Sequence, residues 1–192
     1  MPYDKQPTIE FPAPEGSVLE NWQAIRDHVA KSGHPVVCVE TYPGADTAEI
    51  EAELVEAFGP ALVVRVKDLM LGHDALEILL KPFVTEDRVF GYMAPFQMAD
   101  LFSASDLAAA RHDIEAASEA GRPVLVVGTG AGLLRGEDSY LIYADMPRWE
   151  IQKRMRAGMP NLTAGNPDED TLVKYKRAFF IEWRVADRWK RS

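Results

Sequence analysis

The stretch CVETYPGADTAEIEAEL, residues 38–54, follows an apolar run and opens an amphipathic helix. A phosphate-binding loop of the form Gly-x-x-x-x-Gly-Lys-Thr occupies this kind of position, where its backbone N–H groups surround phosphate and its lysine neutralises it. If Thr47 is aligned with the Ser/Thr of such a loop, Glu40 and Ala45 replace the glycines and Asp46 replaces the lysine. The stretch therefore predicts the position of a phosphate loop without its usual chemistry.

Asp46 has two interpretations that differ in function. As a structural residue it caps the helix, and Glu49, three residues later, completes a capping box. As part of a ligand site it would repel a phosphate ~4 Å away by about 1–4 kcal/mol over the usual effective dielectrics. The sequence favours the cap, and residual phosphate binding through free N–H groups is the alternative.

Composition indicates one globular domain of the α/β class. The chain has 192 residues, of which 47% are hydrophobic and 27% charged, enough for one substantial core. We expect an irregular N-terminal arm over residues 1–18 and a single domain over 19–192. The net charge of −9 argues against a nucleic-acid or membrane partner, because both kinds of partner attract a basic face.

Localisation is predicted from what the sequence does not contain. No apolar stretch approaches the roughly 20 residues of a membrane-spanning helix, and the N-terminus lacks the pattern of a signal peptide. The single cysteine, Cys38, lies in an apolar run and has no partner for a disulfide. A cytoplasmic protein is expected.

Short β-branched runs alternate with amphipathic segments along the chain. We predict strands at 35–40, 61–66, 123–128, 139–145 and 178–185, with helices between them and one helix broken at Pro82. This order is typical of a three-layer, mainly parallel sheet with helices on both faces. Sites in such folds lie beyond the carboxyl ends of the strands, which here are 40–47, 67–68, 128–132 and Asp145.

Two further motifs lie at or just after these strand ends. GTGAGL, residues 128–133, resembles a dinucleotide fingerprint, but another strand and not a helix follows it, which favours a tight glycine turn. The helix PRWEIQKRMRAG, residues 147–158, carries a basic cluster on an acidic chain: Arg148, Lys153, Arg154 and Arg156. These cations would bind an anion, or would simply complement the helix C-terminus. No set of His and Cys has metal-ligand spacing.

Two resemblances follow from these motifs. The order of strand, phosphate-loop position and helix, with PVLVVGTGAGLL and YLIYADMPRWEIQKRMRAG later, resembles the uridine-kinase type of P-loop phosphotransferase with a degenerate phosphate loop. More specifically, EDRVFGYMAPFQMADLFSASDL, VLVVGTGAGLL, YLIYADMPRWEIQKRMRAGMPNL and KYKRAFFIEWRVADRWK resemble the N-terminal domain of long bacterial class I mannose-6-phosphate isomerase-like proteins, over roughly residues 35–190. That resemblance implies a role in carbohydrate metabolism, and no isomerase zinc ligands carry over.

The resulting hypothesis is a kinase-like, non-catalytic domain that binds a sugar phosphate or nucleotide, or regulates a sugar-phosphate enzyme. Tyr42 and Thr47 would form the cleft floor, and the four cations of 148–156 would meet the anion. One alternative is an active phosphotransferase that uses a nucleotide with Mg²⁺; its candidate residues are Glu40 or Asp68 for the metal and Asp145 as base. Another is a structural partner that docks on a sugar-phosphate isomerase or sugar kinase through an aromatic C-terminal strand.

Overall fold

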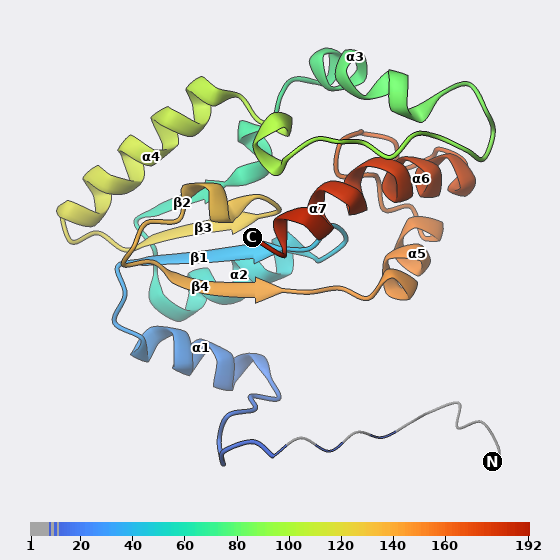
Figure 1. Cartoon of the computed structure of the whole chain (residues 1–192). Coiled ribbons are helices and arrows are strands. Elements are labelled where there is room, and N and C mark those ends of the chain that lie inside the picture. The colour runs from blue at the N-terminus through green and yellow to red at the C-terminus, as the bar shows by residue number, and fades with distance from the viewer. Residues whose placement is uncertain (1–7, 9, 11) are drawn as a thin grey trace.

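Four parallel strands form a sheet at the centre of the protein (Figure 1). The computed structural model describes residues 8, 10 and 12–192. The strand order is β2-β3-β1-β4, and the strands span Val36–Thr41 (β1), Leu62–Arg65 (β2), Val124–Gly128 (β3) and Tyr140–Ala144 (β4). The first four predicted strands are therefore confirmed to within one residue at each end.

Burial explains the composition of the strands. The two central strands, β1 and β3, are buried along their whole length, and parallel strands covered on both faces consist of continuous apolar runs. The edge strand β4 exposes Leu141 and Tyr143. Glu40 lies opposite Gly128 of β3 and Tyr143 of β4, so the carboxyl ends of the three strands meet at one edge of the sheet.

Helices cover both faces of the sheet, as Figure 1 shows. On one face α1 (Trp22–Lys31) and α2 (Thr47–Phe58) pack against Val37 and Val39. On the other face α3 (His73–Val84), α4 (Ala104–Glu119) and the C-terminal helices share a core with Cys38. Because successive strand residues point to opposite faces, one apolar strand supplies both cores. The predicted three-layer α/β arrangement with a parallel sheet is confirmed.

The remaining elements connect or close these layers. Helix α5 spans Arg148–Arg156, and α6 spans Thr171–Arg177. Short 3₁₀ turns follow β2, precede α4 and follow β3, at Val66–Leu69, Met98–Leu101 and Ala131–Leu134. The predicted break at Pro82 is wrong, because α3 continues through Pro82 and ends two residues later at Val84. The proline removes one N–H donor from the last turn, and the helix ends soon after it.

The C-terminal strand predicted at 178–185 is wrong. Helix α6 continues into a π-helical segment, Ala178–Glu182, and then into α7, Trp183–Trp189. Ala178, Ile181 and Val185 are buried at spacings of three and four residues, which is a helical pattern. A short apolar run is consistent with either a buried strand or a buried helix, so the run AFFIEWRV did not decide between them.

The described residues before α1 form no regular structure. Part of the predicted arm, residues 1–7, 9 and 11, lies outside the described residues, and 12–20 form neither helix nor strand. Among the described residues, no helix is both long enough and apolar enough to cross a membrane.

Candidate functional site

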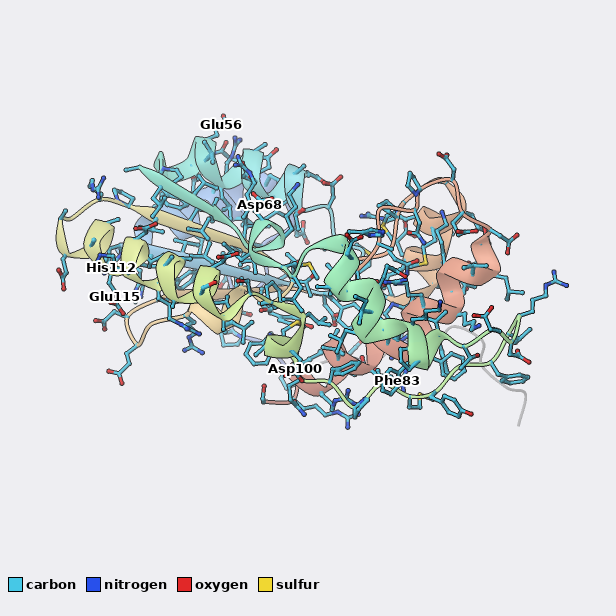
Figure 2. The ribbon with its side chains drawn as sticks, turned by 90° about the horizontal axis from the view of Figure 1, so that it is seen from above. Glu56, Asp68, Phe83, Asp100, His112 and Glu115 are labelled. Carbon is cyan, nitrogen blue, oxygen red and sulfur yellow. The ribbon has the colours of Figure 1, made fainter. Side chains whose placement is uncertain are left out.

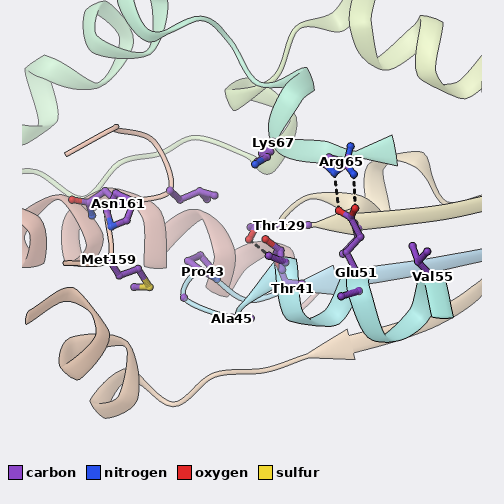
Figure 3. Close-up of a pocket in the computed structure, with 18 residues that line it drawn as sticks. Thr41, Pro43, Ala45, Glu51, Val55, Arg65, Lys67, Thr129, Met159 and Asn161 are labelled. Atoms are coloured by element: carbon purple, nitrogen blue, oxygen red, sulfur yellow. Dashed lines mark hydrogen bonds and ion pairs between the residues drawn. The ribbon is translucent and has the colours of Figure 1, made fainter. Parts of the chain in front are cut away.

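A cavity of about 590 Å³ opens where β1, β2 and β3 end (Figure 3). One wall is the turn after β1 and the part of α2 from Thr47 to Val55, and the opposite wall comes from the ends of β2 and β3. A loop after α5, residues 159–162, closes one end. The cavity is lined by Thr41, Pro43, Gly44, Ala45, Thr47, Ala48, Glu51, Ala52, Val55, Arg65, Lys67, Val127, Gly128, Thr129, Met159, Pro160, Asn161 and Leu162.

The polar groups of this cavity differ in whether they already have partners. The hydroxyls of Thr41 and Thr129 lie 3.1 Å apart and bond to each other. The Arg65 guanidinium donates two hydrogen bonds to Glu51, one of them 2.7 Å long, which neutralises its charge (Figure 3). The exposed side chain of Lys67 forms neither an ion pair nor a hydrogen bond with any residue that the structure describes. Lys67 is therefore the unneutralised cation of the lining.

The turn after β1 does not present its N–H groups as a phosphate loop would. Asp46 Oδ1 accepts hydrogen bonds from the N–H groups of Ala48 (3.1 Å) and Glu49 (3.0 Å). The predicted helix cap is confirmed, but Glu49 does not complete a capping box, because its carboxylate accepts the Trp22 indole N–H at 3.0 Å. Two donors at the start of α2 are thus already occupied by Asp46.

Tyr42 and Arg148 lie away from the cavity in a separate cluster. The Tyr42 hydroxyl donates to Asp187 Oδ1 at 2.8 Å, and Arg148 forms an ion pair with the same carboxylate. The Arg148 guanidinium also lies 5.2 Å from the centre of the Trp183 ring. The pKa of Tyr42 is raised to about 12, mainly by burial and secondly by the hydrogen bond to Asp187. These two predicted ligand residues connect β1 and α5 to α7.

The other predicted cations of α5 are also engaged elsewhere. Lys153 pairs with Glu150 at 2.5 Å. Arg154 donates to the carbonyl of Gly44 at 3.0 Å, and Arg156 lies over the Trp149 and Tyr175 rings. Of the six predicted ligand residues, the structure places only Thr47 in the lining of the cavity. The anion-binding role of α5 therefore remains a prediction that the geometry of this cavity does not support.

The candidate catalytic and metal residues are not brought together. Asp68 is exposed on the 3₁₀ turn after β2, outside the lining (Figure 2). Asp145 accepts the Met146 N–H and pairs with Lys190 at 2.5 Å. Within the part of the chain that the structure describes, no three His, Cys, Asp or Glu residues are grouped as metal ligands. The residues proposed for Mg²⁺ and for a base do not form one centre.

Glu40, the candidate metal ligand, instead holds the glycine turn after β3. Its buried carboxylate accepts the N–H groups of Gly130 at 2.7 Å and Gly132 at 2.8 Å, and the Trp189 indole N–H at 2.9 Å. A Cβ at position 132 would lie 2.9 Å from the Trp189 ring, so only glycine fits this approach. GTGAGL is thus a glycine turn, as predicted, and its tight geometry serves a buried carboxylate.

Glu40 gives the stability of the fold a dependence on pH. Burial raises its pKa above the ordinary value of 4.5, and this effect exceeds the opposing effect of the three N–H donors. The folded state therefore binds this proton more readily than the unfolded state. The resulting stabilisation is complete below pH 4.5 and is lost as pH rises through the folded-state pKa.

We expect wild type to gain stability relative to Glu40→Gln as pH falls through this window, because the glutamine does not titrate. Urea unfolding of both proteins over a series of pH values measures the difference. A difference that stays constant with pH, or changes in the opposite direction, would contradict a raised pKa at Glu40.

Sequence reasoning missed the importance of Lys67 and Thr129, although both lie at strand ends that it identified. The basic cluster of 148–156 predicts an anion site because cations are concentrated there. Lys67 differs from the neighbouring Arg65 because it has no carboxylate partner among the described residues. Arg65 pairs with Glu51, which is 14 residues away. Sequence spacing does not reveal such a pair, so it cannot show which of the two cations is free.

One comparison with known proteins gives a match. The chain matches no curated protein and no solved structure. Residues 21–192 match the family model described as a domain of unknown function (DUF8485). This match spans α1 to the end of the chain and includes every residue of the cavity. The chain belongs to the DUF8485 family.

Proposed function

We propose that the cavity at the carboxyl ends of β1, β2 and β3 binds a phosphorylated small molecule, and that the chain is a kinase-like domain of carbohydrate metabolism without strong catalysis of its own. The observation that carries the proposal is Lys67, a cation with no described partner in the wall of a cavity of about 590 Å³. Burying a phosphate against this ammonium would give the strong, charge-assisted hydrogen bonds that phosphates form.

The lining favours a sugar phosphate over a nucleotide. The described lining residues include no aromatic side chain on which a base would stack. They do include the hydroxyls of Thr41, Thr47 and Thr129 and the paired charges of Glu51 and Arg65, which are the groups that hydrogen-bond to sugar hydroxyls. The apolar surface of Val55 and Met159 suits the carbon face of a sugar ring.

Weak or absent turnover follows from the turn after β1. In the proposed alignment with a phosphate loop, Asp46 replaces the lysine, and its carboxylate caps α2. The active-phosphotransferase alternative needs a metal at Glu40 or Asp68, but three donors occupy the Glu40 carboxylate and Asp68 lies outside the cavity. Binding without phosphoryl transfer is the better account of this arrangement.

Isothermal titration calorimetry against a panel of ligands tests the proposal. We expect glucose 6-phosphate or mannose 6-phosphate to bind, the corresponding free sugars to bind at least about tenfold more weakly, and AMP and ATP to bind more weakly than the sugar phosphates. Circular dichroism confirms that the protein is folded. No heat of binding at millimolar sugar phosphate in folded protein would refute the proposal.

The docking alternative also has an observation in its favour, although the predicted aromatic strand does not exist. Phe90, Tyr92, Met93 and Trp149 are 68%, 68%, 52% and 64% exposed, and Phe179 is 39% exposed. Exposed apolar surface of this kind often marks a protein interface. Silent titrations, together with co-purification of a sugar-phosphate isomerase or sugar kinase, would favour this second function.

A further inference from the structure

A second cavity, of about 330 Å³, lies between α1, α2 and the end of β4. Its accessible apolar surface comes from Trp22, Ile25 and Ile142, which are half-buried, whereas Val39 and Leu54 are buried beneath them. The apolar part of the lining comprises Trp22, Ile25, Val39, Ala45, Ile50, Leu54, Ile142, Ala144 and Met146. The volume is at the lower end of the range for small-molecule sites, and it suits one ring with a short side chain.

The polar residues that line this second cavity are Asp46, Glu49, Asp145 and Arg154, together with Tyr143. Asp145 is neutralised by Lys190 at 2.5 Å, and Arg154 interacts with Glu150 at 3.6 Å. Asp46 and Glu49, in contrast, are exposed and form no ion pair with any residue in the described part of the chain. The local balance of charge is therefore negative.

The carboxylates of Asp46 and Glu49 each retain an oxygen for a ligand. Asp46 Oδ1 accepts the two N–H groups at the start of α2, and Glu49 Oε1 accepts the Trp22 indole N–H. Their other oxygens, Oδ2 and Oε2, make no hydrogen bond to a described residue. An ammonium group has donors for both oxygens and no acceptor.

We propose that this second cavity binds a small apolar amine. The apolar body would pack against Trp22, Ile25 and Ile142, which have accessible apolar surface, because burying such surface is the main favourable contribution there. The ammonium would donate to Asp46 Oδ2 and Glu49 Oε2. The apolar chamber carries the affinity, and the two carboxylates select a cation over a neutral or anionic head group.

The two cavities are adjacent but use different chemistry. Ala45 belongs to both linings, whereas Lys67 belongs only to the first and Ile142 only to the second. The amine site therefore does not depend on the proposed sugar-phosphate site, and variants at Lys67 and Ile142 separate the two.

The test compares 2-phenylethylamine with 2-phenylethanol, which has the same ring and chain but no charge. Isothermal titration of the full chain at neutral pH is expected to show the amine binding with a Kd on the order of 0.1–1 mM, as suits about nine non-hydrogen atoms. The alcohol is expected to bind at least about tenfold more weakly, because it lacks the charge-assisted hydrogen bonds.

Four variants locate the binding. The double variant Asp46→Asn with Glu49→Gln keeps both hydrogen-bond acceptors, including the helix cap, and is expected to weaken amine binding about tenfold. Ile142→Trp is expected to fill the cavity and abolish binding. Lys67→Ala is expected to bind the amine as wild type does, as is Glu115→Gln, a carboxylate variant on α4 (Figure 2).

The proposal would be overturned by any of three results in variants shown to be folded by circular dichroism: equal binding of alcohol and amine, unchanged amine binding in the charge-neutral double variant, or loss of amine binding in Lys67→Ala. If Ile142→Trp does not fold, the double variant and the alcohol decide the outcome by themselves.

Discussion

Replacing Lys67 with alanine is expected to weaken binding of a sugar phosphate to the first cavity by roughly ten- to hundredfold. This range corresponds to about 1.5–3 kcal/mol, which is typical for hydrogen bonds to a charged group. The loss should be specific to the phosphate, because the cavity retains the Thr41–Thr129 hydroxyl pair and the Glu51–Arg65 ion pair. Calorimetric titration of wild type and variant measures the ratio.

Lys153→Ala is the matched control for this substitution. Lys153 is also an exposed lysine, but it pairs with Glu150 and lies outside the cavity. Its replacement is expected to change affinity less than about twofold. If Lys153→Ala weakens binding and Lys67→Ala does not, the basic helix α5 holds the anion, as the sequence first suggested, and the role assigned to Lys67 is wrong.

Glu182→Ala is expected to lower the free energy of unfolding by about 3–5 kcal/mol. Glu182 is 1% exposed, and its carboxylate accepts the Thr163 N–H at 2.7 Å, the Thr163 hydroxyl at 2.8 Å and the Asn161 side-chain amide at 2.9 Å. Alanine would leave these three donors without their acceptor in a buried environment, which costs more than the net value of each bond.

The same cluster shapes one end of the first cavity. Asn161 lines that cavity, and the buried Lys174 donates to the carbonyls of Met159 at 3.3 Å and Pro167 at 2.8 Å. The loop after α5 is thus attached to α6 and to the π-helical segment by buried polar contacts. Losing Glu182 should destabilise the loop as well as the domain.

Urea unfolding with a shared m-value measures the effect. Glu115→Ala on the exposed face of α4 is the control, with an expected change within about 0.5 kcal/mol. A loss at Glu182 of less than about 1 kcal/mol would show that water or neighbouring groups satisfy the three donors, against the role given to this carboxylate.

The parts of the fold that sequence predicted well are those with local causes. The runs VVCV and VLVV specify buried parallel strands because both faces need apolar side chains, and Asp46 before α2 specifies a cap because its oxygen reaches N–H groups two and three residues later. These features depend on neighbouring residues, so spacing alone reveals them.

The parts that sequence could not predict depend on contacts between distant residues. The N–H donors to Glu40 come from Gly130 and Gly132, about 90 residues away, so the local sequence does not show that this carboxylate is occupied and predicts a metal ligand instead. Asp187 binds both Tyr42 and Arg148 but is far along the chain, so the local sequence predicts that these two residues are free for a ligand. A polar residue at a strand end indicates a site only when the fold leaves it without such a partner.

The most direct test of the central claim is an NMR titration of ¹⁵N-labelled full-length protein with glucose 6-phosphate. The account predicts saturable shifts of the backbone amides of Lys67, Gly128, Thr129 and Thr47, which surround the first cavity, and little change along α5. Shifts confined to α5, or no shift at millimolar ligand in folded protein, would contradict the assignment of this cavity as the phosphate site.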